Sequence, residues 1–302
     1  MHLKHIQTKM LKYISILSGL TVLLFISSCD KTNKEKVERS QKEILEQRRL
    51  DSLALKVGAT PTMDCLPLFI AQEKGWYKND GVDIRIKLRN SHLDLDTLLA
   101  GGYIEGSATE RTRARHIIDK GMALDYIAET NLSWKLVTNK LNRIKQLSQL
   151  SDKMLAMTRL SATDSLADLV ISKAKAKSDI YKIQINDVNI RLRMLLNNEM
   201  DAMFLPEPQA TAARMNNHRP IADSLFAKTN VGVIAFRKEV LGDTLRRQQL
   251  KVFEKRYNEA CDSINKYGLA GYADIISKYM GVDEKCIKSI PEQKYKHAKV
   301  RF

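Results

Sequence analysis

The sequence has none of the short motifs that mark the commonest catalytic and nucleotide-binding sites. It contains no G-x-S-x-G, no H-E-x-x-H and no G-x-x-x-x-G-K-[ST]. Two of its six histidines lie near the N-terminus, and the others, His92, His116, His218 and His297, are widely spaced. These absences argue against a hydrolase, an ATPase and a metal centre. We therefore expect a protein that is not an enzyme and needs no cofactor or metal.

Cysteine is scarce, with four residues among 302. No C-x-x-C pair occurs, so a zinc or redox site has no support. Cys261 and Cys286 lie on neighbouring predicted helices and could form a disulfide in an oxidising compartment. The spacing alone does not decide whether they do.

The sequence also lacks an apolar run long enough to cross a bilayer. Its most apolar stretch, residues 14–26, has about 13 residues, whereas a spanning helix needs about 20. This stretch follows a lysine-bearing segment and ends in Ser27-Ser28-Cys29. A basic segment, an apolar run and small residues, in that order, are typical of a secretory signal. A short, uncleaved membrane anchor is the alternative.

The end of this segment resembles the bacterial lipoprotein signal, in which the cysteine is lipidated and becomes the mature N-terminus. The resemblance implies a signal peptide over residues 1–28 and a lipid on Cys29. The protein would then work in the cell envelope, tied to a membrane. Asp30 resembles an inner-membrane retention signal of some Gram-negative bacteria, which favours the inner membrane facing the periplasm. The outer membrane remains an alternative.

Positive charge is in excess, because 50 lysines and arginines face 35 acidic residues and give a net charge of +15. Such a surface suits nucleic acid, an anionic bilayer or an anionic ligand. Nucleic acid is the least fitting partner for an exported protein. The basic residues are also spread out, so we favour a solvated surface that faces anionic lipid.

The remaining chain shows the alternation expected of an α/β protein. Residues 29–52 are dense in charge and predict a solvated tether. Beyond them, residues 82–88 alternate strictly and predict a strand, whereas residues 66–74 predict a helix that Gly75 ends. Further strand and helix patterns alternate on both sides of a polar break at 139–152. The sequence therefore predicts two α/β lobes, each a sheet covered by helices.

Three blocks of this pattern resemble a known family. They read LPLFIAQEKGWYKNDG over residues 66–81, LLAGGYIEGS over 98–107 and LNNEMDAMFLPEP over 196–208. They resemble the solute-binding proteins of ABC importers, in the branch that binds nitrate, alkanesulfonates, taurine or the pyrimidine precursor of thiamine. The resemblance implies the type II periplasmic-binding-protein fold, a monomer that binds a small molecule, and a separate permease with its ATPase subunits.

On this basis we expect two lobes that are joined by a hinge. The first lobe would comprise residues 53–137 and a return segment at 229–302, and the second lobe residues 138–228. The connecting segments would lie near 134–142 and 224–232.

Three loops, each between a predicted strand and a helix, are expected to line the cleft between the lobes. In open α/β sheets, ligands bind beyond the carboxyl ends of the strands. The candidate ligand-binding residues are Thr62 and Asp64 in the first loop, Ser107, Thr109 and Glu110 in the second, and Thr158, Arg159 and Ser161 in the third. Glu207, held between two prolines, is a further candidate. Helix capping by Asp64 or Thr109 and a surface position for Arg159 are the alternatives.

The charge of the ligand stays open at this point. Arg159 and the helix N-termini would favour an anion, whereas Glu110 or Glu207 would meet the cationic group of a zwitterion. The sequence thus predicts a lipid-anchored protein that captures a small organic or inorganic ion by hinge closure. The alternatives are an enzyme on the same fold that acts on a pyrimidine-like metabolite, and a structural lipoprotein that binds anionic polymers.

Overall fold

The structure, a computed structural model, describes residues 36–223 and 231–301. The predicted signal peptide and Cys29 lie outside the described residues. Residues 1–54 form a unit of their own, and its described part is an exposed helix over residues 36–53. Glu46 and Arg49 form an ion pair at 2.9 Å on this helix. None of the helices in the described ranges is both long and apolar enough to cross a membrane.

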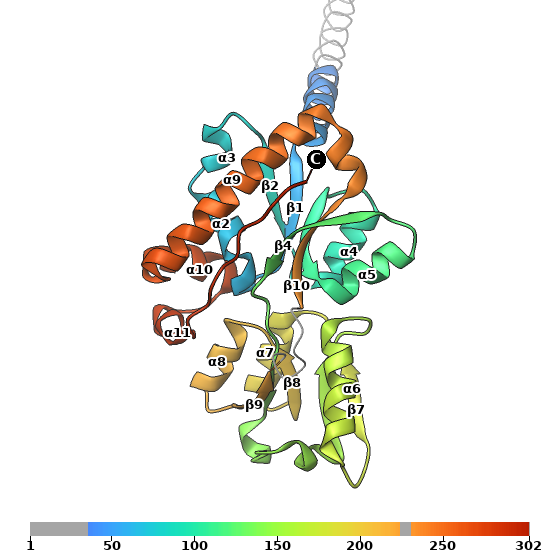
Figure 1. The fold of residues 1–302 in the computed structure, drawn as a ribbon, viewed down its shortest axis with the longest axis vertical. Helices are drawn as coiled ribbons and strands as arrows, with labels where there is room; N and C mark the ends of the chain where they lie inside the picture. The colour runs from blue at the N-terminus through green and yellow to red at the C-terminus, as the bar shows by residue number, and fades with distance from the viewer. Residues whose placement is uncertain (1–35, 224–230, 302) are drawn as a thin grey trace, which may run out of the picture. The chain divides into compact units, whose positions relative to one another are not determined.

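The second unit, Leu55–Phe302, contains two five-stranded sheets (Figure 1). The strands of the first sheet, in spatial order, are β2 (Ile84–Leu88), β1 (Leu55–Ala59), β3 (Gly106–Glu110), β10 (Gly232–Arg237) and β4 (Leu124–Thr130). Strands β1, β2 and β3 are parallel, while β10 runs antiparallel to both of its neighbours. Strand β10 therefore returns to a sheet whose first strand, β1, begins 177 residues earlier in the chain.

Helices cover both faces of this sheet. They are α2 (Leu66–Glu73), α3 (Trp76–Asn79), α4 (His92–Ala100), α5 (Arg111–Asp119), α9 (Thr244–Tyr267), α10 (Ala273–Met280) and α11 (Glu284–Ser289). Figure 1 shows the long helix α9 running along one side of the sheet. Phe253 of α9 meets Phe236 of β10 edge to face at 5.4 Å, and Phe69 of α2 stacks on Tyr279 of α10. This aromatic packing joins the helical layer to the central strands.

Gly106 provides a stability test of this packing. A Cβ at this position would lie 2.5 Å from the Phe236 ring. We expect Gly106→Ala to lower the free energy of unfolding by about 1–3 kcal/mol, because a tightly packed core cannot accept the extra methyl group without a shift. Urea unfolding checks this, with Gly242→Ala as the control because no atom lies within 4 Å of its added Cβ. Equal losses in the two variants would contradict the prediction.

The second sheet has the order β7 (Ile180–Gln184), β6 (Lys153–Met157), β8 (Ala202–Leu205), β5 (Lys135–Thr138) and β9 (Arg219–Asp223). Strands β6, β7 and β8 are parallel, and β5 runs antiparallel to β8 and β9. Helices α6 (Ala162–Ala174), α7 (Val188–Leu196) and α8 (Gln209–Met215) pack against it. Asp187 caps α7 by accepting from the amides of Asn189 and Ile190. The predicted α/β class, with two sheets flanked by helices, is thereby confirmed.

Several elements differ from the sequence prediction. Strand β5 belongs to the second sheet, so the chain leaves the first sheet between Thr130 and Lys135, earlier than the expected boundary after residue 137. A short strand has the same pattern in either sheet, and its distant partners β8 and β9 decide where it lies. Helices α3 and α8 and strand β9 were not predicted. Pro220 lies in β9, which is tolerated because β9 is an edge strand.

The cysteines of the described residues do not form the disulfide that seemed available. Cys65, Cys261 and Cys286 are buried free thiols. Burial raises the pKa of Cys261 to about 12 and that of Cys286 to about 11. Both are therefore neutral thiols at physiological pH and act as small apolar side chains in the core.

Candidate functional site

The loops at the carboxyl ends of β3 and β6 meet between the two sheets. Glu110 ends β3, and its Oε2 accepts a hydrogen bond of 2.8 Å from the amide of Ala162, the first residue of α6. Arg113 of α5 donates to the backbone oxygen of Arg159 at 3.2 Å. Val188 of α7 donates to the backbone oxygen of Asn90 at 3.3 Å. Groups of the first lobe thus form hydrogen bonds with residues at or just before the N-termini of α6 and α7 in the second lobe.

The loop after β1 makes a second set of bonds between the lobes. The amide of Met63 donates to the backbone oxygen of Glu207 at 2.9 Å, and Gln209 Nε2 donates to the backbone oxygen of Pro61 at 2.9 Å. Arg214 also reaches the backbone oxygen of Ser289 at 2.7 Å. With these bonds made, the two lobes are in a closed arrangement.

A small cavity is enclosed where the two lobes meet. Its volume is about 10 Å³, which is room for about one water molecule. Its lining combines one guanidinium group, one carboxyl group, an imidazole, an indole and short polar side chains: His92, Glu110, Arg113, Trp134, Thr158, Ser161 and Asn186. A ligand could enter this space after the lobes have separated.

Two buried guanidinium groups lie beside this cavity. Arg113 pairs with Asp96 at 2.5 Å. Arg191 of α7 donates to the backbone oxygens of Ile185 and Phe204 and to Thr158 Oγ1, at 2.7, 2.9 and 2.6 Å. Its guanidinium also lies 5.5 Å from the centre of the Trp134 ring. Burial lowers the pKa of Arg191 to about 10, so it stays charged at neutral pH.

The two remaining titratable groups of the cavity have strongly shifted pKa values. Burial raises the pKa of Glu110 to about 7, against the opposing effects of the Ala162 amide, Arg113 and Arg191. Burial, together with Arg113 and Arg191, lowers the pKa of His92 to about 3. His92 is therefore neutral at physiological pH, and its Nε2 has no hydrogen-bond partner in the structure. Shifts of this kind are concentrated at functional sites.

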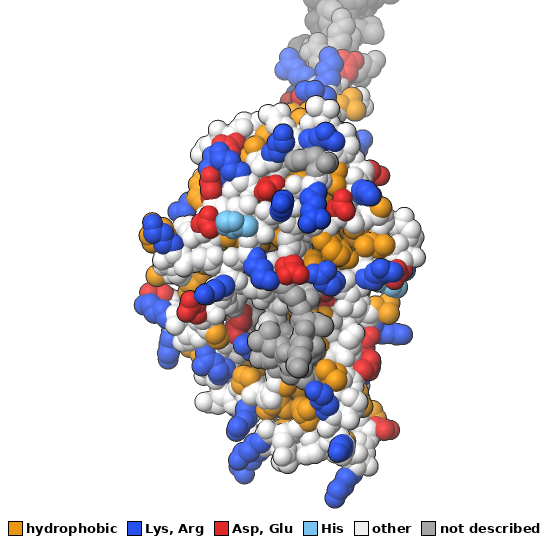
Figure 2. Space-filling model, viewed as in Figure 1, with side chains coloured by type: hydrophobic (Ala, Val, Ile, Leu, Met, Phe, Trp, Pro, Cys, Tyr) orange, Lys and Arg blue, Asp and Glu red, His pale blue; other side chains and the backbone are white. Residues whose placement is uncertain are grey.

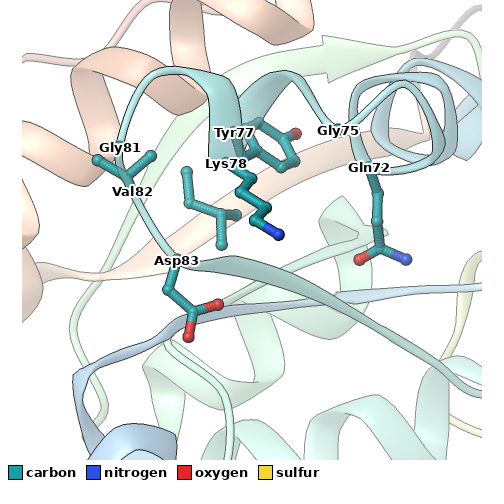
Figure 3. Close-up of a pocket in the computed structure, with 8 residues that line it drawn as sticks. Gln72, Gly75, Tyr77, Lys78, Gly81, Val82 and Asp83 are labelled. Carbon is teal, nitrogen blue, oxygen red and sulfur yellow. The ribbon is translucent and has the colours of Figure 1, made fainter.

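A larger cavity lies at the edge of the first sheet. Its volume is about 480 Å³, and its walls come from the end of α2, α3 and the turn before β2, including Gln72, Tyr77, Lys78 and Asp83 (Figure 3). It opens beside the amino end of β2 rather than at the carboxyl ends of the strands. We therefore place the candidate site in the cavity between the lobes.

Family comparison adds to this geometry. Residues 62–244 match the family model described as NMT1/THI5 like. The chain belongs to the NMT1/THI5-like family. The match covers both lobes and includes Glu110, Arg113, Thr158 and Arg191. No curated protein matches the sequence.

Solved structures share the fold of this NMT1/THI5-like protein at low identity. The ligand-binding component of an ABC-type import system from Staphylococcus aureus, solved with zinc bound, has a TM-score of 0.69 at 15% identity, covering 82% of this chain and 87% of that one. The alkanesulfonate-binding protein SsuA from Xanthomonas axonopodis pv. citri, bound to MOPS, has 0.65 at 15%, covering 78% and 82%. The nitrate-binding protein NrtA from Synechocystis has 0.64 at 16%, covering 78% and 68%. The expected periplasmic-binding-protein fold is thereby confirmed.

Three of the predicted site residues line the cavity of this NMT1/THI5-like protein. These are Glu110, Thr158 and Ser161. Ser161 caps α6 by accepting from the amide of Thr163, and its hydroxyl donates to the backbone oxygen of Thr158 at 2.6 Å. Arg159 lies beside them in sequence, but its side chain is exposed, and it contributes its backbone oxygen to Arg113. In this closed arrangement Arg159 is therefore a surface arginine, which is the alternative that the sequence left open.

The predicted residues of the first loop are buried within the first lobe. Thr62 Oγ1 donates to Asp64 Oδ1 at 2.6 Å, and Thr130 Oγ1 donates to Asp64 Oδ2 at 3.1 Å. Asp64 therefore ties the loop after β1 to the end of β4, and no side-chain cap is made at the helix that follows. Burial raises the pKa of Asp64 despite these hydrogen bonds. Neither residue is among those that line the cavity.

Ser107, Thr109 and Glu207 also lie away from the lining. Ser107 and Thr109 are buried in β3, and Thr109 Oγ1 has no hydrogen-bond partner. Glu207 accepts from the amide of Thr211 at 3.0 Å and lies 3.5 Å from Lys135 Nζ. Glu207 thus stabilises the start of α8 next to the bonds between the lobes.

His92, Arg113 and Arg191 were missed as site residues. Each lies inside a helix, where a sequence reading treats a basic residue as part of a solvated face. One sequence signal could have identified Arg113 and Arg191 as buried. Both lie on the side of their helix where the helical period predicts apolar residues that face the core. Among residues 36–223 and 231–301, no group of three or more histidines, cysteines or acids is arranged to hold a metal ion.

Surface charge forms no single basic patch on the face drawn in Figure 2. Lysine and arginine side chains are scattered there, with acidic side chains among them. Several pair across the surface, such as Arg256 with Asp80 and Lys278 with Glu73. The lysine of the Lys278–Glu73 pair is largely exposed, and a pair of this kind contributes little to stability.

Proposed function

We propose that this protein is a membrane-tethered solute-binding lipoprotein. It captures a small organic or inorganic ion, of the sulfonate, nitrate or pyrimidine-precursor class, and delivers it to an ABC permease with separate ATPase subunits. The observation that carries this proposal is the enclosed cavity between two α/β lobes, at the carboxyl ends of β3 and β6, where the titratable groups of Glu110 and His92 have shifted pKa values.

The mechanism follows from the position of the cavity. Residues 55–130 with 232–301 form one lobe, and residues 135–223 form the other. The solute binds while the lobes are apart and is enclosed when they close. A ligand that contacts both lobes binds the closed arrangement more strongly and shifts the population toward it. The permease would then recognise the closed form.

A thermal-shift and calorimetric screen tests this function. The panel holds alkanesulfonates, nitrate, bicarbonate, amino acids and pyrimidines. A true ligand at a concentration of 100 times its dissociation constant should stabilise the fold by about 3 kcal/mol. Binding to none of these compounds, together with salt-sensitive binding to a polyanion, would contradict the proposal and favour the structural alternative.

The proposed lipid anchor gives a separate prediction. Cys29→Ser should move the protein from the membrane fraction to the soluble fraction and impair uptake, because the tether would no longer hold it near its permease. Solute affinity should stay unchanged, since all the residues that line the cavity belong to the second unit. Fractionation and calorimetry check both parts, with Ser28→Ala as the control that keeps a small residue before the cysteine. Full retention in the membrane would contradict the anchor.

A further inference from the structure

The backbone amides that usually bind an anion at a helix N-terminus already have hydrogen-bond partners in this cleft. At the start of α6, the amide of Ala162 donates to Glu110, and that of Thr163 donates to Ser161 Oγ. The amide of Asp164 donates to the backbone oxygen of Ser161. Helix N-termini attract anions because their first amides lack partners. Here the protein supplies its own carboxylate in the place of that anion.

The basic groups of the cleft are engaged as well. Arg113 is held by Asp96 and by the backbone oxygen of Arg159, and Arg191 is held by three neutral acceptors. The buried charges around the cavity are therefore two guanidinium groups and two carboxylates, those of Asp96 and Glu110. They balance while Glu110 is ionised. A simple anion would add an uncompensated negative charge in a buried site, which is unfavourable.

His92 shows that the cavity is nevertheless built for a ligand. Its side chain is 6% exposed, it lines the same cavity, and its Nε2 lacks a hydrogen-bond partner. Buried polar groups without a partner are rare in folded proteins. An unpartnered imidazole nitrogen and a carboxylate in the lining of one cavity match a solute whose polar groups can bond both.

We propose that Glu110 is a specificity-determining residue that holds the anion position at the entrance of α6, so that the cleft rejects simple anions and admits solutes that offer an N–H donor to this carboxylate. This inference rests on the proposed solute-binding function and narrows its ligand class. On binding, the donor of the solute takes the place of the Ala162 amide at Glu110. The freed amide can then donate a hydrogen bond to an anionic group of the same solute, as in a zwitterion.

Direct titration with matched probes tests the inference. Ethanesulfonate and nitrate are the simple anions, and 2-aminoethanesulfonate differs from the former by one ammonium group. Binding is followed by calorimetry and by tryptophan fluorescence, because Trp134 lines the cavity. Glu110→Gln removes the charge, and Glu110→Ala also vacates the position. Asp164→Asn is the control, because it removes another acid from the first turn of the same helix.

The wild-type protein should bind 2-aminoethanesulfonate at least tenfold more tightly than ethanesulfonate. Both Glu110 variants should gain at least tenfold in affinity for ethanesulfonate and nitrate, and the preference for the amine should fall. Asp164→Asn should behave as the wild type. The inference is overturned if the wild-type protein prefers neither sulfonate, if neither Glu110 variant gains anion affinity, or if Asp164→Asn gains as much.

These outcomes can be told apart from a failure of the proposed function. If wild-type protein binds ethanesulfonate or nitrate tightly and the Glu110 variants change nothing, solute binding stands and the role of Glu110 is wrong. If no compound of the wider solute panel binds the wild-type protein, the function itself fails. Circular dichroism of each variant establishes that the fold is retained in these comparisons.

Discussion

Replacing Arg191 by methionine is expected to lower the free energy of unfolding by about 3 kcal/mol or more. Arg191 is 1% exposed and donates to Ile185 O, Phe204 O and Thr158 Oγ1. Methionine fills much of the same volume but donates no hydrogen bond. Each buried acceptor left without a donor costs about 1–3 kcal/mol, and water entering the space would recover part of this. The loss of positive charge also leaves Glu110 with one fewer attractive partner.

Urea unfolding of a small variant set measures this effect. Arg193→Met is the matched control, because Arg193 lies on the same helix, α7, with its side chain exposed. It should change the free energy of unfolding by less than about 0.5 kcal/mol. The free energy of unfolding of Arg191→Lys should lie between those of the two methionine variants. The lysine ammonium keeps the positive charge, but it lacks the planar guanidinium that bonds three acceptors at once. Equal stability of Arg191→Met and Arg193→Met would show that the three bonds contribute little.

The sequence predicts the fold correctly where the local residue pattern alone determines the secondary structure. Residues 82–88 alternate strictly, and most of them form β2, while Pro67 lies in the first turn of α2 as expected. The lobe boundary expected after residue 137 falls inside β5, because a strand of four residues carries no information about its distant partners. Strand β9 was missed because an edge strand that contains proline has a weak signal.

Part of the candidate site could also be predicted from local residue patterns. Glu110 ends β3, and Thr158 and Ser161 lie in the short loop after β6, so the ends of predicted strands locate all three. Asp64 also follows a strand, but its carboxylate turns into the first lobe toward Thr130, which no local pattern reveals. His92 reaches the cavity from α4 of the first lobe, and Arg191 lies beside it on α7 of the second lobe. Which residues face one another there depends on how two separate sheets meet.

Glu110 should make stability depend on pH in a way that a glutamine variant removes. Its pKa is about 7 in the folded protein, against about 4.5 for an ordinary glutamate. Below pH 4.5 the carboxyl is protonated in both states, so it imposes no penalty. Between pH 4.5 and 7 the unfolded chain loses this proton while the folded protein keeps it. The stabilising contribution of Glu110 is therefore lost as the pH rises through about 7.

The expected size of this effect is about 3 kcal/mol, because a shift of about 2.5 in pKa corresponds to that free energy. The groups that face Glu110 are Arg113 on α5, Asp96 and His92 on α4, and Arg191 on α7. His92 acts in the opposite direction, since its lowered pKa stabilises the protein above pH 6.5 and this contribution fades as the pH falls. The difference between variant and wild type at each pH isolates the Glu110 contribution from that of His92.

Glu110→Gln should therefore match the wild type near pH 4.5 and become progressively more stable than it up to pH 8, because glutamine still accepts from the Ala162 amide without a charge. Urea unfolding at half-unit steps of pH measures this difference.

The control variant Asp164→Asn should show a difference of the opposite sign. Burial alone would raise the pKa of Asp164, but Lys182 and the Leu160 amide together hold it below its ordinary value. Its contribution to stability is present at high pH, so the asparagine variant should fall behind the wild type as the pH rises. A Glu110→Gln difference that stays flat from pH 4.5 to 8 would mean that Glu110 titrates as an exposed glutamate does, and that the lobes do not enclose it in solution.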